Sequence, residues 1–164
     1  MKKLIFIRHG RAEDPAPEIS DFERSLTVKG KSISKLMAHK FHETENAPMV
    51  LITSTAFRAL ETAIIFAQEF GIKPEDITLN SNLYYMANIK TIFDIIAKAG
   101  NETDVITLFG HNPAFTEIPD RLCKKGCDSV TKTGIVCISF KIKSWADLKL
   151  DSGKQEYFLK PEKQ

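Results

Sequence analysis

Three short, predominantly apolar runs set the strongest limit on how this chain can fold. They lie at residues 4–7, 49–53 and 105–109, and polar residues follow each of them at once. A run of this length without alternation is typical of a β-strand that is buried on both faces, as in a parallel sheet covered by helices. Segments with helical apolar spacing separate the runs, and this alternation predicts an α/β fold with a mostly parallel central sheet.

A first helix is predicted to begin after Thr27, whose hydroxyl is a suitable N-cap. Apolar residues then recur at helical spacing, so we expect one face of this helix to be buried. That face consists of Ile33, Leu36, Met37 and Phe41.

A second helix is predicted directly after the second strand, with Ser54 or Thr55 as its N-cap and Gly71 at its end. A third is predicted over residues 89–99, and a fourth after Pro113, because proline is tolerated in a first helical turn. The expected apolar face of the second helix consists of Ala59, Leu60, Ala63, Ile64, Ala67 and Phe70.

The remaining segments are expected to be shorter strands and loops. Residues 14–26 contain two prolines and several acids, which is typical of a loop, and residues 77–80 fit a short strand. Alternation over residues 136–142 predicts a half-buried strand, and residues 153–159 could pair with it as an edge hairpin. The charged tail from Pro161 is expected to fray.

Composition indicates an ordinary globular protein. A chain of 164 residues fits a single domain spanning residues 1–164, and its formal net charge of +2 gives no argument for a nucleic-acid or membrane partner. No apolar run approaches the roughly 20 residues that span a bilayer. The first residues lack the apolar length and cleavage site of a signal peptide, so we expect a cytoplasmic protein.

The cysteines favour reduced thiols. Cys123, Cys127 and Cys137 are odd in number, and no second cysteine pair stands at zinc-finger spacing from Cys123 and Cys127. We therefore expect free thiols at a helix end, with a redox-labile pair as an alternative.

The residues that end the predicted strands form a constellation suited to phosphate chemistry. Arg8 and His9 follow the first strand, Arg58 lies in the first turn of the second helix, and His111 follows the third strand. If the three strands are parallel neighbours, these side chains converge at one edge of the sheet, where helix N-termini also favour anions. Arginine presents a planar set of donors that matches phosphate oxygens.

His9 is the expected nucleophile of this constellation. Nearby guanidinium charge disfavours the imidazolium form, so His9 should be neutral and able to form a covalent phosphohistidine. No metal or cofactor is called for, because Arg8 and Arg58 supply the positive charge.

Three motifs then resemble the histidine phosphatase superfamily. They are Arg8-His9-Gly10, Ser54-x-x-x-Arg58-Ala59-x-x-Thr62-Ala63, and Gly110-His111-Asn112-Pro113, and the resemblance runs from residue 3 to about residue 142. The short length and Asp21-x-x-Arg24-x-Leu26-Thr27-x-x-Gly30 are similar to the SixA-type phosphohistidine phosphatases.

The resemblance implies a three-layer α/β sandwich of the phosphoglycerate-mutase-like kind. It also implies that His9 is phosphorylated and that Arg8, Arg58 and His111 hold the phosphate. We place Gly10 and Asn112 beside them as substrate-binding residues. Asn112 is expected to act mainly as the N-cap of the following helix.

One departure from the superfamily pattern bears on the substrate. Many members have a glutamate general acid between the second arginine and the late histidine, but residues 79–85 contain no acid, and Asn82 stands about where it is expected. A phosphate ester needs its alkoxide protonated as it leaves, whereas a phosphoimidazole is more labile. The absence of an acid therefore favours phosphohistidine, although Glu13, Asp14 or Asp21 could still supply a carboxylate.

Three functions follow from this reading. The first is a phosphatase acting on a phosphohistidine-bearing protein, the second is a small-molecule phosphomonoesterase, and the third is a non-catalytic module that binds phosphorylated partners.

Arg24 could pair with Asp21 at the surface or reach toward substrate. His39 and His42 are expected on a solvated helix face rather than in a metal site.

Overall fold

The computed structural model describes residues 1–85 and 87–163, which contain one sheet of six strands. The strand order is β3-β2-β4-β1-β5-β6. The first four are mutually parallel, β5 is antiparallel to β1, and β6 is antiparallel to β5. The strands are β1 (Lys2–Arg8), β2 (Val50–Thr53), β3 (Thr78–Leu79), β4 (Val105–Gly110), β5 (Ile135–Phe140) and β6 (Lys154–Leu159). The predicted α/β fold with a mostly parallel sheet is confirmed.

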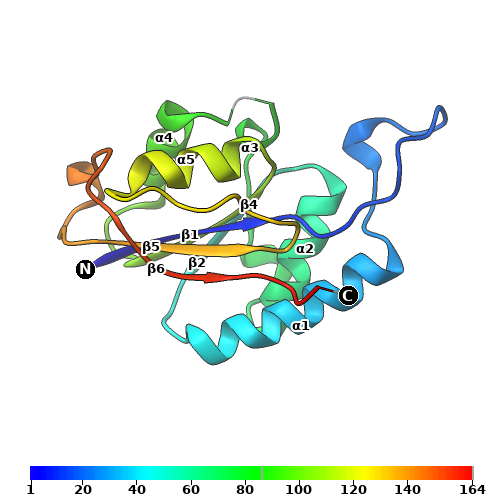
Figure 1. The fold of residues 1–164 in the computed structure, drawn as a ribbon, viewed down its shortest axis with the longest axis horizontal. Helices are drawn as coiled ribbons and strands as arrows, with labels where there is room; N and C mark the ends of the chain where they lie inside the picture. The colour runs from blue at the N-terminus through cyan, green and yellow to red at the C-terminus, as the bar shows by residue number, and fades with distance from the viewer. Residues whose placement is uncertain (86, 164) are drawn as a thin grey trace.

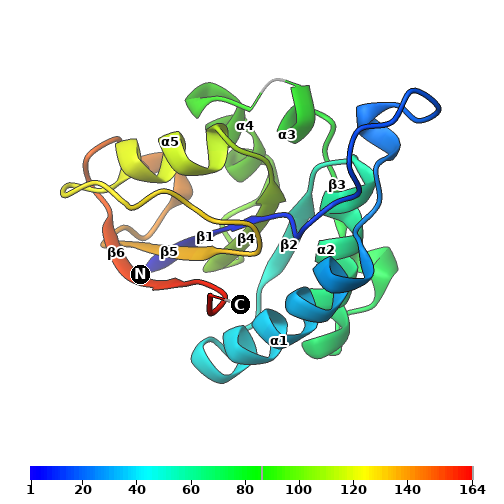
Figure 2. The same ribbon diagram turned by 45° about the vertical axis from the view of Figure 1, so that its right-hand side comes forward.

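Helices cover both faces of the sheet, which makes three layers (Figure 1). The second view separates the group of helices on one face from the group on the other (Figure 2). The first group is α1 (Val28–Thr44) and α2 (Phe57–Glu69), and the second is α3 (Asn82–Tyr85), α4 (Ile89–Ala99) and α5 (Ala114–Leu122). Short 3₁₀ turns occur at Asp21–Glu23, Pro74–Asp76 and Trp145–Asp147.

β1 is buried on both faces, as its continuous apolar run predicts. Leu4 and Phe6 pack into the core under α4 and α5, and Ile5 and Ile7 pack into the core under α1 and α2. All four are fully buried. This burial fixes the direction in which the strand delivers Arg8 and the residues that follow it.

The expectation of a half-buried strand near residue 138 is wrong. All six residues of β5 are buried, because Cys137 packs into the core under α1 and α2 and Ser139 is also shielded from water. The Ser139 hydroxyl is satisfied there by a hydrogen bond to Glu156 on β6. The predicted pairing of β6 with this strand is confirmed.

The start of α1 agrees with the sequence, but its buried face differs. Thr27 is the N-cap, and its Oγ1 accepts a hydrogen bond from the Gly30 N–H at 2.9 Å. Leu36 was expected to be buried and is 65% exposed. The helix instead turns Gly30 and Ser34 inward, and a Cβ at position 30 would collide with the Arg11 carbonyl oxygen. This close approach joins α1 to the first loop.

The N-cap predicted for α2 is also wrong. Ala56 occupies this position and makes no side-chain capping bond. The Ser54 hydroxyl accepts a hydrogen bond from the Ala56 N–H and lies against His111. Ser54 is thereby released from the predicted capping role and is available to the site.

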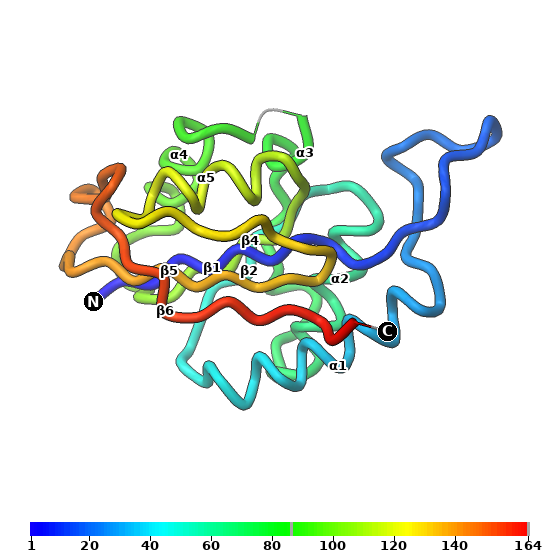
Figure 3. Tube along the Cα trace, in the orientation of Figure 1, coloured from blue at the N-terminus to red at the C-terminus, as the bar shows by residue number. Residues whose placement is uncertain are grey.

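The long loop between β1 and α1 projects from the body and returns to α1, as the tube trace shows (Figure 3). It is closed by an isolated bridge between Ala12 and Leu26 and by the hydrogen bond from the Thr27 N–H to the Arg11 carbonyl. The C-terminal residues run back beside α1 (Figure 3).

The thiols of Cys123, Cys127 and Cys137 are free, as predicted. Cys123 is the C-cap of α5, and the Cys127 thiol donates to its Sγ at 3.2 Å. No helix in residues 1–85 or 87–163 is both long and apolar enough to cross a membrane.

Candidate active site

The carboxyl ends of three parallel strands bring the predicted residues together. Arg8 pairs with Gly110 across β1 and β4, and Thr53 pairs with Phe109 across β2 and β4. The pairing continues past the strands, because the His9 N–H donates to the Gly110 carbonyl at 3.0 Å. The imidazole rings of His9 and His111 consequently lie 5.1 Å apart, centroid to centroid.

The hydrogen bonds of His9 define which ring nitrogen is free to react. Nδ1 lies 2.7 Å from the Gly10 carbonyl oxygen. A carbonyl can only accept, so Nδ1 carries the proton and Nε2 carries the lone pair. The Nε–H of Arg58 points at this lone pair from 3.3 Å. His9 therefore presents a nucleophilic Nε2 in a strongly cationic setting.

Burial is the main reason why the pKa of His9 is lowered to about 4, and the positive charges of Arg58, Arg8 and Lys132 lower it further. The side chain is only 8% exposed. At neutral pH the imidazole is thus uncharged, as the sequence analysis expects of the nucleophile.

Arg58 joins α2 to the first loop while facing His9. Its Nη1 donates to the Asp21 backbone carbonyl at 2.6 Å, and its Nη2 donates to the Asp21 carboxylate at 3.0 Å. The side chain is buried, and the Thr62 hydroxyl donates to its backbone carbonyl. Three of the five guanidinium N–H groups are occupied, which leaves two for a bound anion.

Asp21 completes a bridge that links the first loop to α3. The Tyr84 hydroxyl donates to the same Asp21 oxygen, Oδ2, at 2.7 Å, and Arg24 pairs with Oδ1 at 2.9 Å. The hydrogen bond from Tyr84, followed by those from Arg58 and Arg24, lowers the pKa of Asp21 to about 2. Asp21 is therefore an ionised carboxylate at neutral pH, and Arg24 takes the surface pairing of its two predicted roles.

His111 has one ring nitrogen engaged and one free. Its Nε2 lies 2.7 Å from the Ser54 Oγ, while its Nδ1 is buried and has no hydrogen-bond partner in the described part of the chain. Burial, followed by the charges of His9 and Arg58, lowers the pKa of His111 to about 3. The Tyr84 ring lies 5.4 Å away, centroid to centroid.

Arg8 and Asn112 meet at one backbone oxygen. The Arg8 Nη1 and the Asn112 Nδ2 both donate to the Val130 carbonyl at 3.1 Å. The Arg8 Nε is buried and has no partner within residues 1–85 and 87–163, and burial lowers the pKa of this guanidinium. The prediction that Asn112 is the N-cap of α5 is wrong, since Pro113 occupies that position. The Asn112 Oδ1 accepts a hydrogen bond from the Thr116 hydroxyl rather than from a backbone N–H of the helix.

Gly10 is used for packing and positioning. Its N–H donates to the Thr62 Oγ1 at 3.1 Å, and a Cβ there would lie 2.7 Å from the Ser34 Oγ. The direct contact of Gly10 and Asn112 with substrate stays a prediction.

Two site residues were not identified from the sequence as part of the site. Tyr84 belongs to no periodic pattern in the sequence. Ser54 begins the motif that contains Arg58, but its position directly after a strand predicts a helix N-cap rather than a site residue. Asn82, the position at which a general acid was expected, is exposed, and its N–H donates a hydrogen bond to the Asn80 Oδ1.

His39 is exposed and pairs with Glu43 and Glu69 on the helix surface. Within the described residues, no group of three His, Cys, Asp or Glu side chains could hold a metal ion.

Comparison with known proteins gives little at the level of sequence. No protein-family model matches the chain. An uncharacterized protein of Picosynechococcus sp. is 38% identical over 74 residues, which cover 44% of this chain and 45% of that protein. The match thus spans less than half of either chain.

Solved structures cover nearly the whole chain. A protein from Agrobacterium tumefaciens assigned as a phosphohistidine phosphatase SixA has a TM-score of 0.79, 22% identity and 98% coverage of each chain. The fold is that of the histidine phosphatases. A protein histidine phosphatase SixA complexed with tungstate has a TM-score of 0.78, 18% identity and 96% coverage of each chain. A mycobacterial glucosyl-3-phosphoglycerate phosphatase has a TM-score of 0.69 and 10% identity, covering 96% of this chain and 98% of that one.

Two neutral histidines, His9 and His111, are largely buried in this structure, which makes its stability depend on pH. The folded-state pKa values of His9 and His111 lie below the usual 6.5, so the unfolded chain binds more protons between about pH 4 and 6.5. We expect the free energy of unfolding to fall by about 1–3 kcal/mol from pH 6.5 to pH 5. Urea unfolding at several pH values would measure this slope.

The double variant His9→Asn/His111→Asn should flatten this dependence, whatever its absolute stability. His39→Asn is the matched control, because His39 is exposed and Glu69 raises its pKa. A slope that survives in the double variant would contradict the assignment of buried neutral histidines.

Proposed function

We propose that this protein is a phosphatase that removes the phosphoryl group from phosphohistidine through a covalent intermediate on His9. In the first step the His9 Nε2 lone pair attacks phosphorus, and the bond from phosphorus to the substrate imidazole breaks. The bonding electron pair leaves with that imidazole, which departs as a neutral ring because its other nitrogen carries a proton. In the second step the oxygen of water attacks phosphorus, and the bond from phosphorus to the His9 Nε2 breaks with its electron pair returning to Nε2. The proton lost by the water leaves with the inorganic phosphate or passes to solvent.

The observation that carries this proposal is the tautomer of His9. The Gly10 carbonyl holds the proton on Nδ1, so the lone pair lies on Nε2, where the Arg58 Nε–H points at it from 3.3 Å. The lowered pKa keeps that lone pair available at neutral pH. A histidine that served only as a phosphate ligand would gain from being protonated, and burial opposes protonation here.

The surroundings of His9 suit the transferred phosphoryl group. Arg58 has two N–H groups to spare, and the Arg8 Nε and His111 Nδ1 are buried without partners in the described chain. Unpaired buried polar atoms are costly, and a phosphoryl group that accepts from them would remove this cost. Fixed donors of this kind stabilise charge on the phosphoryl oxygens as the group moves in line.

The leaving group decides between phosphohistidine and an ester. An alkoxide needs an acid to protonate it as it leaves, whereas a phosphoimidazole that is protonated on its other ring nitrogen releases a neutral ring without further help. Asp21 is the carboxylate bound to Arg58, and with a pKa of about 2 it has no proton to give at pH 7. The tungstate-bound structure with the same fold is described as a protein histidine phosphatase, which supports a protein substrate here.

A second candidate, hydrolysis of small phosphate esters, is favoured by Glu117. This carboxylate lines a hollow of 180 Å³ together with Tyr84, His111 and Asn112. Glu117 is the acidic residue among the described residues that line this hollow with His111, so it is the candidate to protonate a departing alkoxide. The hollow is small, so such an ester would have to be compact.

An assay on both substrate classes separates the two functions. We expect the wild-type protein to release phosphate from a phosphohistidine-bearing protein with kcat/KM at least about 10³-fold above that for phosphate esters, because an unassisted alkoxide leaves slowly. Glu117→Gln should change phosphohistidine turnover less than about threefold.

Glu102→Gln, which removes a similarly exposed carboxylate before the amino end of β4, the opposite end of that strand from His111, is the control. Efficient ester hydrolysis that is lost in Glu117→Gln and kept in Glu102→Gln would identify the protein as an esterase. Phosphate binding without turnover of either class would support a phosphate-reading module instead.

A further inference from the structure

A strongly basic hollow lies next to the candidate active site. It has a volume of 410 Å³, and four cationic side chains line it: Arg8, Arg11, Lys29 and Lys132. Glu162 is the one acidic residue among its described lining residues. The whole chain carries a net charge of only +2, so this is a local concentration of charge.

These cations are not neutralised by the protein. Within residues 1–85 and 87–163, none of the four forms an ion pair, whereas Lys2, Lys3 and Arg24 all pair with carboxylates elsewhere. Arg11, Lys29 and Lys132 are exposed. Uncompensated charges of one sign around a hollow attract a ligand of the opposite sign.

Backbone hydrogen bonds hold Lys132 next to the carboxyl end of β1. The N–H of the next residue, Thr133, donates to the carbonyls of Arg8 and His9 at 3.0 and 3.2 Å. Thr133 is buried and has a φ of 58°, a conformation that a β-branched residue rarely adopts. Strain of this kind persists where surrounding contacts hold it, often at functional sites. Lys132 is close enough for its charge to act on His9.

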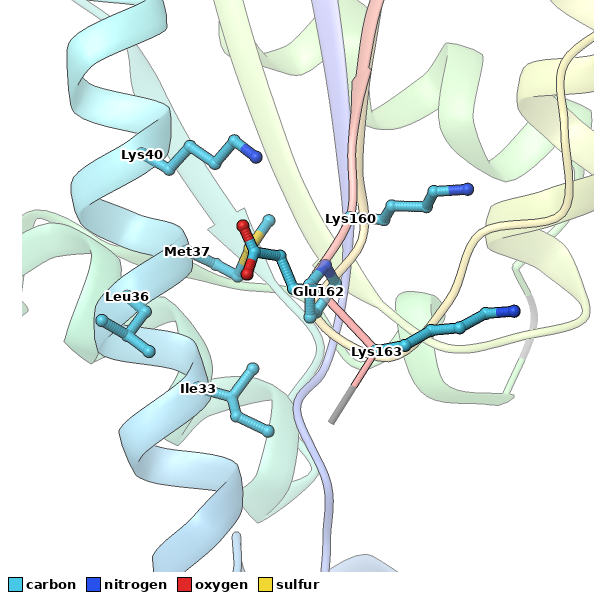
Figure 4. A pocket seen from close by; sticks show the side chains of 8 residues that line it. Ile33, Leu36, Met37, Lys40, Lys160, Glu162 and Lys163 are labelled. Atoms are coloured by element: carbon cyan, nitrogen blue, oxygen red, sulfur yellow. The ribbon is translucent and has the colours of Figure 1, made fainter.

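The basic hollow lies beside a second hollow, and the two together suit a chain-like ligand. The second hollow has a volume of 320 Å³ and lies between α1 and the C-terminal residues (Figure 4). The two share Ile33, Pro161 and Glu162 as lining residues. Figure 4 shows Ile33 and Met37 of α1 extending toward the C-terminal residues, with Lys40 further along the same side of the helix. A single inorganic anion needs far less surface than the two hollows offer together.

We infer that the basic hollow is a subsite for acidic side chains of the substrate protein, located next to its phosphohistidine. Arg8 belongs both to the proposed phosphate site and to this hollow, so a ligand bound at His9 extends directly into it. Aspartate or glutamate residues near the phosphohistidine would then pair with Arg11, Lys29 and Lys132. This inference rests on the proposed function and names the substrate class of the same site.

The test uses two synthetic phosphohistidine peptides of equal length, one with aspartates flanking the phosphohistidine and one with serines. We expect kcat/KM for the acidic peptide to exceed that for the neutral peptide about tenfold at low salt, mainly through KM, and to fall as salt is added. The double variant Arg11→Gln/Lys29→Gln should lose most of this preference and keep its rate on the neutral peptide. Lys35→Gln/Lys98→Gln, which removes two exposed lysines outside the hollow, should keep the preference.

Equal kcat/KM on the two peptides, or an equal loss in both double variants, would overturn the subsite. If neither peptide is turned over, the proposed function fails, and the subsite is then judged by the anisotropy of a labelled, unphosphorylated aspartate peptide. Binding that Arg11→Gln/Lys29→Gln weakens about fivefold or more would support it, and unchanged binding would overturn it. An RNA oligonucleotide that competes as strongly as the acidic peptide would overturn the assignment to an acidic protein.

Discussion

Replacing His9 with alanine should lower turnover at least about 10⁴-fold while leaving the fold intact. The substitution removes the lone pair that attacks phosphorus, and nothing else in the site replaces it: the His111 Nε2 is engaged by Ser54. The fold should persist because the His9 backbone, which pairs with Gly110, is unchanged. Steady-state assays on a phosphohistidine protein, with circular dichroism as the folding check, would measure both.

Trapping the intermediate makes this prediction specific to a covalent mechanism. Wild-type protein quenched in alkali after brief exposure to labelled substrate should carry one acid-labile phosphate, since phosphohistidine survives alkali. His9→Ala should carry none, and the exposed His39→Ala should behave as wild type. Label that persists in His9→Ala, or turnover within about tenfold of wild type, would exclude His9 as the nucleophile.

The convergence of Arg8, His9 and His111 could be predicted from the sequence because strand pairing enforces it. Continuous apolar runs identify strands that are buried on both faces, and polar residues directly after such parallel strands must meet at one sheet edge. The observed pairing of Arg8 with Gly110 places the residues that follow β1 and β4 side by side, as this argument predicts. Arg58 follows from the same argument, because it lies within the first turn of α2 after β2.

The bridge from Asp21 to Tyr84 could not be predicted in the same way. Its two ends are 63 residues apart, one in an irregular loop and one in a four-residue helix, so no periodic pattern records their contact. The sequence predicts Asp21 as a possible partner of Arg24 and as one of several acids that could supply a carboxylate, but its contacts with Arg58 and Tyr84 depend on the fold. The exposed Leu36 fails for a related reason, since the inward turn of Gly30 and Ser34 depends on the first loop.

Arg58→Ala should be the second most damaging substitution, with a loss in kcat/KM of about 10³-fold. Arg58 is 5% exposed and donates to His9 and to the backbone carbonyl and the carboxylate of Asp21. Its removal therefore affects both the proposed phosphate-binding residues and the first loop. It also removes a positive charge that lowers the pKa of His9 and holds down the pKa of Asp21. Both pKa values should therefore rise, which an NMR titration would detect.

Two further variants, Arg58→Lys and Asp21→Asn, separate the role of the Arg58 charge from the roles of its planar donors and of its contact with the first loop. Lysine keeps the charge but lacks the planar set of donors, so we expect it to recover the low pKa of His9 and still lose about 10²-fold in kcat/KM. Asp21→Asn keeps the side-chain shape and weakens the contacts of the Asp21 carboxylate with Arg58, Tyr84 and Arg24, while the hydrogen bond from Arg58 to the Asp21 backbone carbonyl can persist. It should therefore cost less than about tenfold. If Asp21→Asn is as damaging as Arg58→Ala, Arg58 acts by holding the loop. If Arg58→Lys retains wild-type activity, the fork of donors is not used, and charge alone is what the phosphoryl group requires.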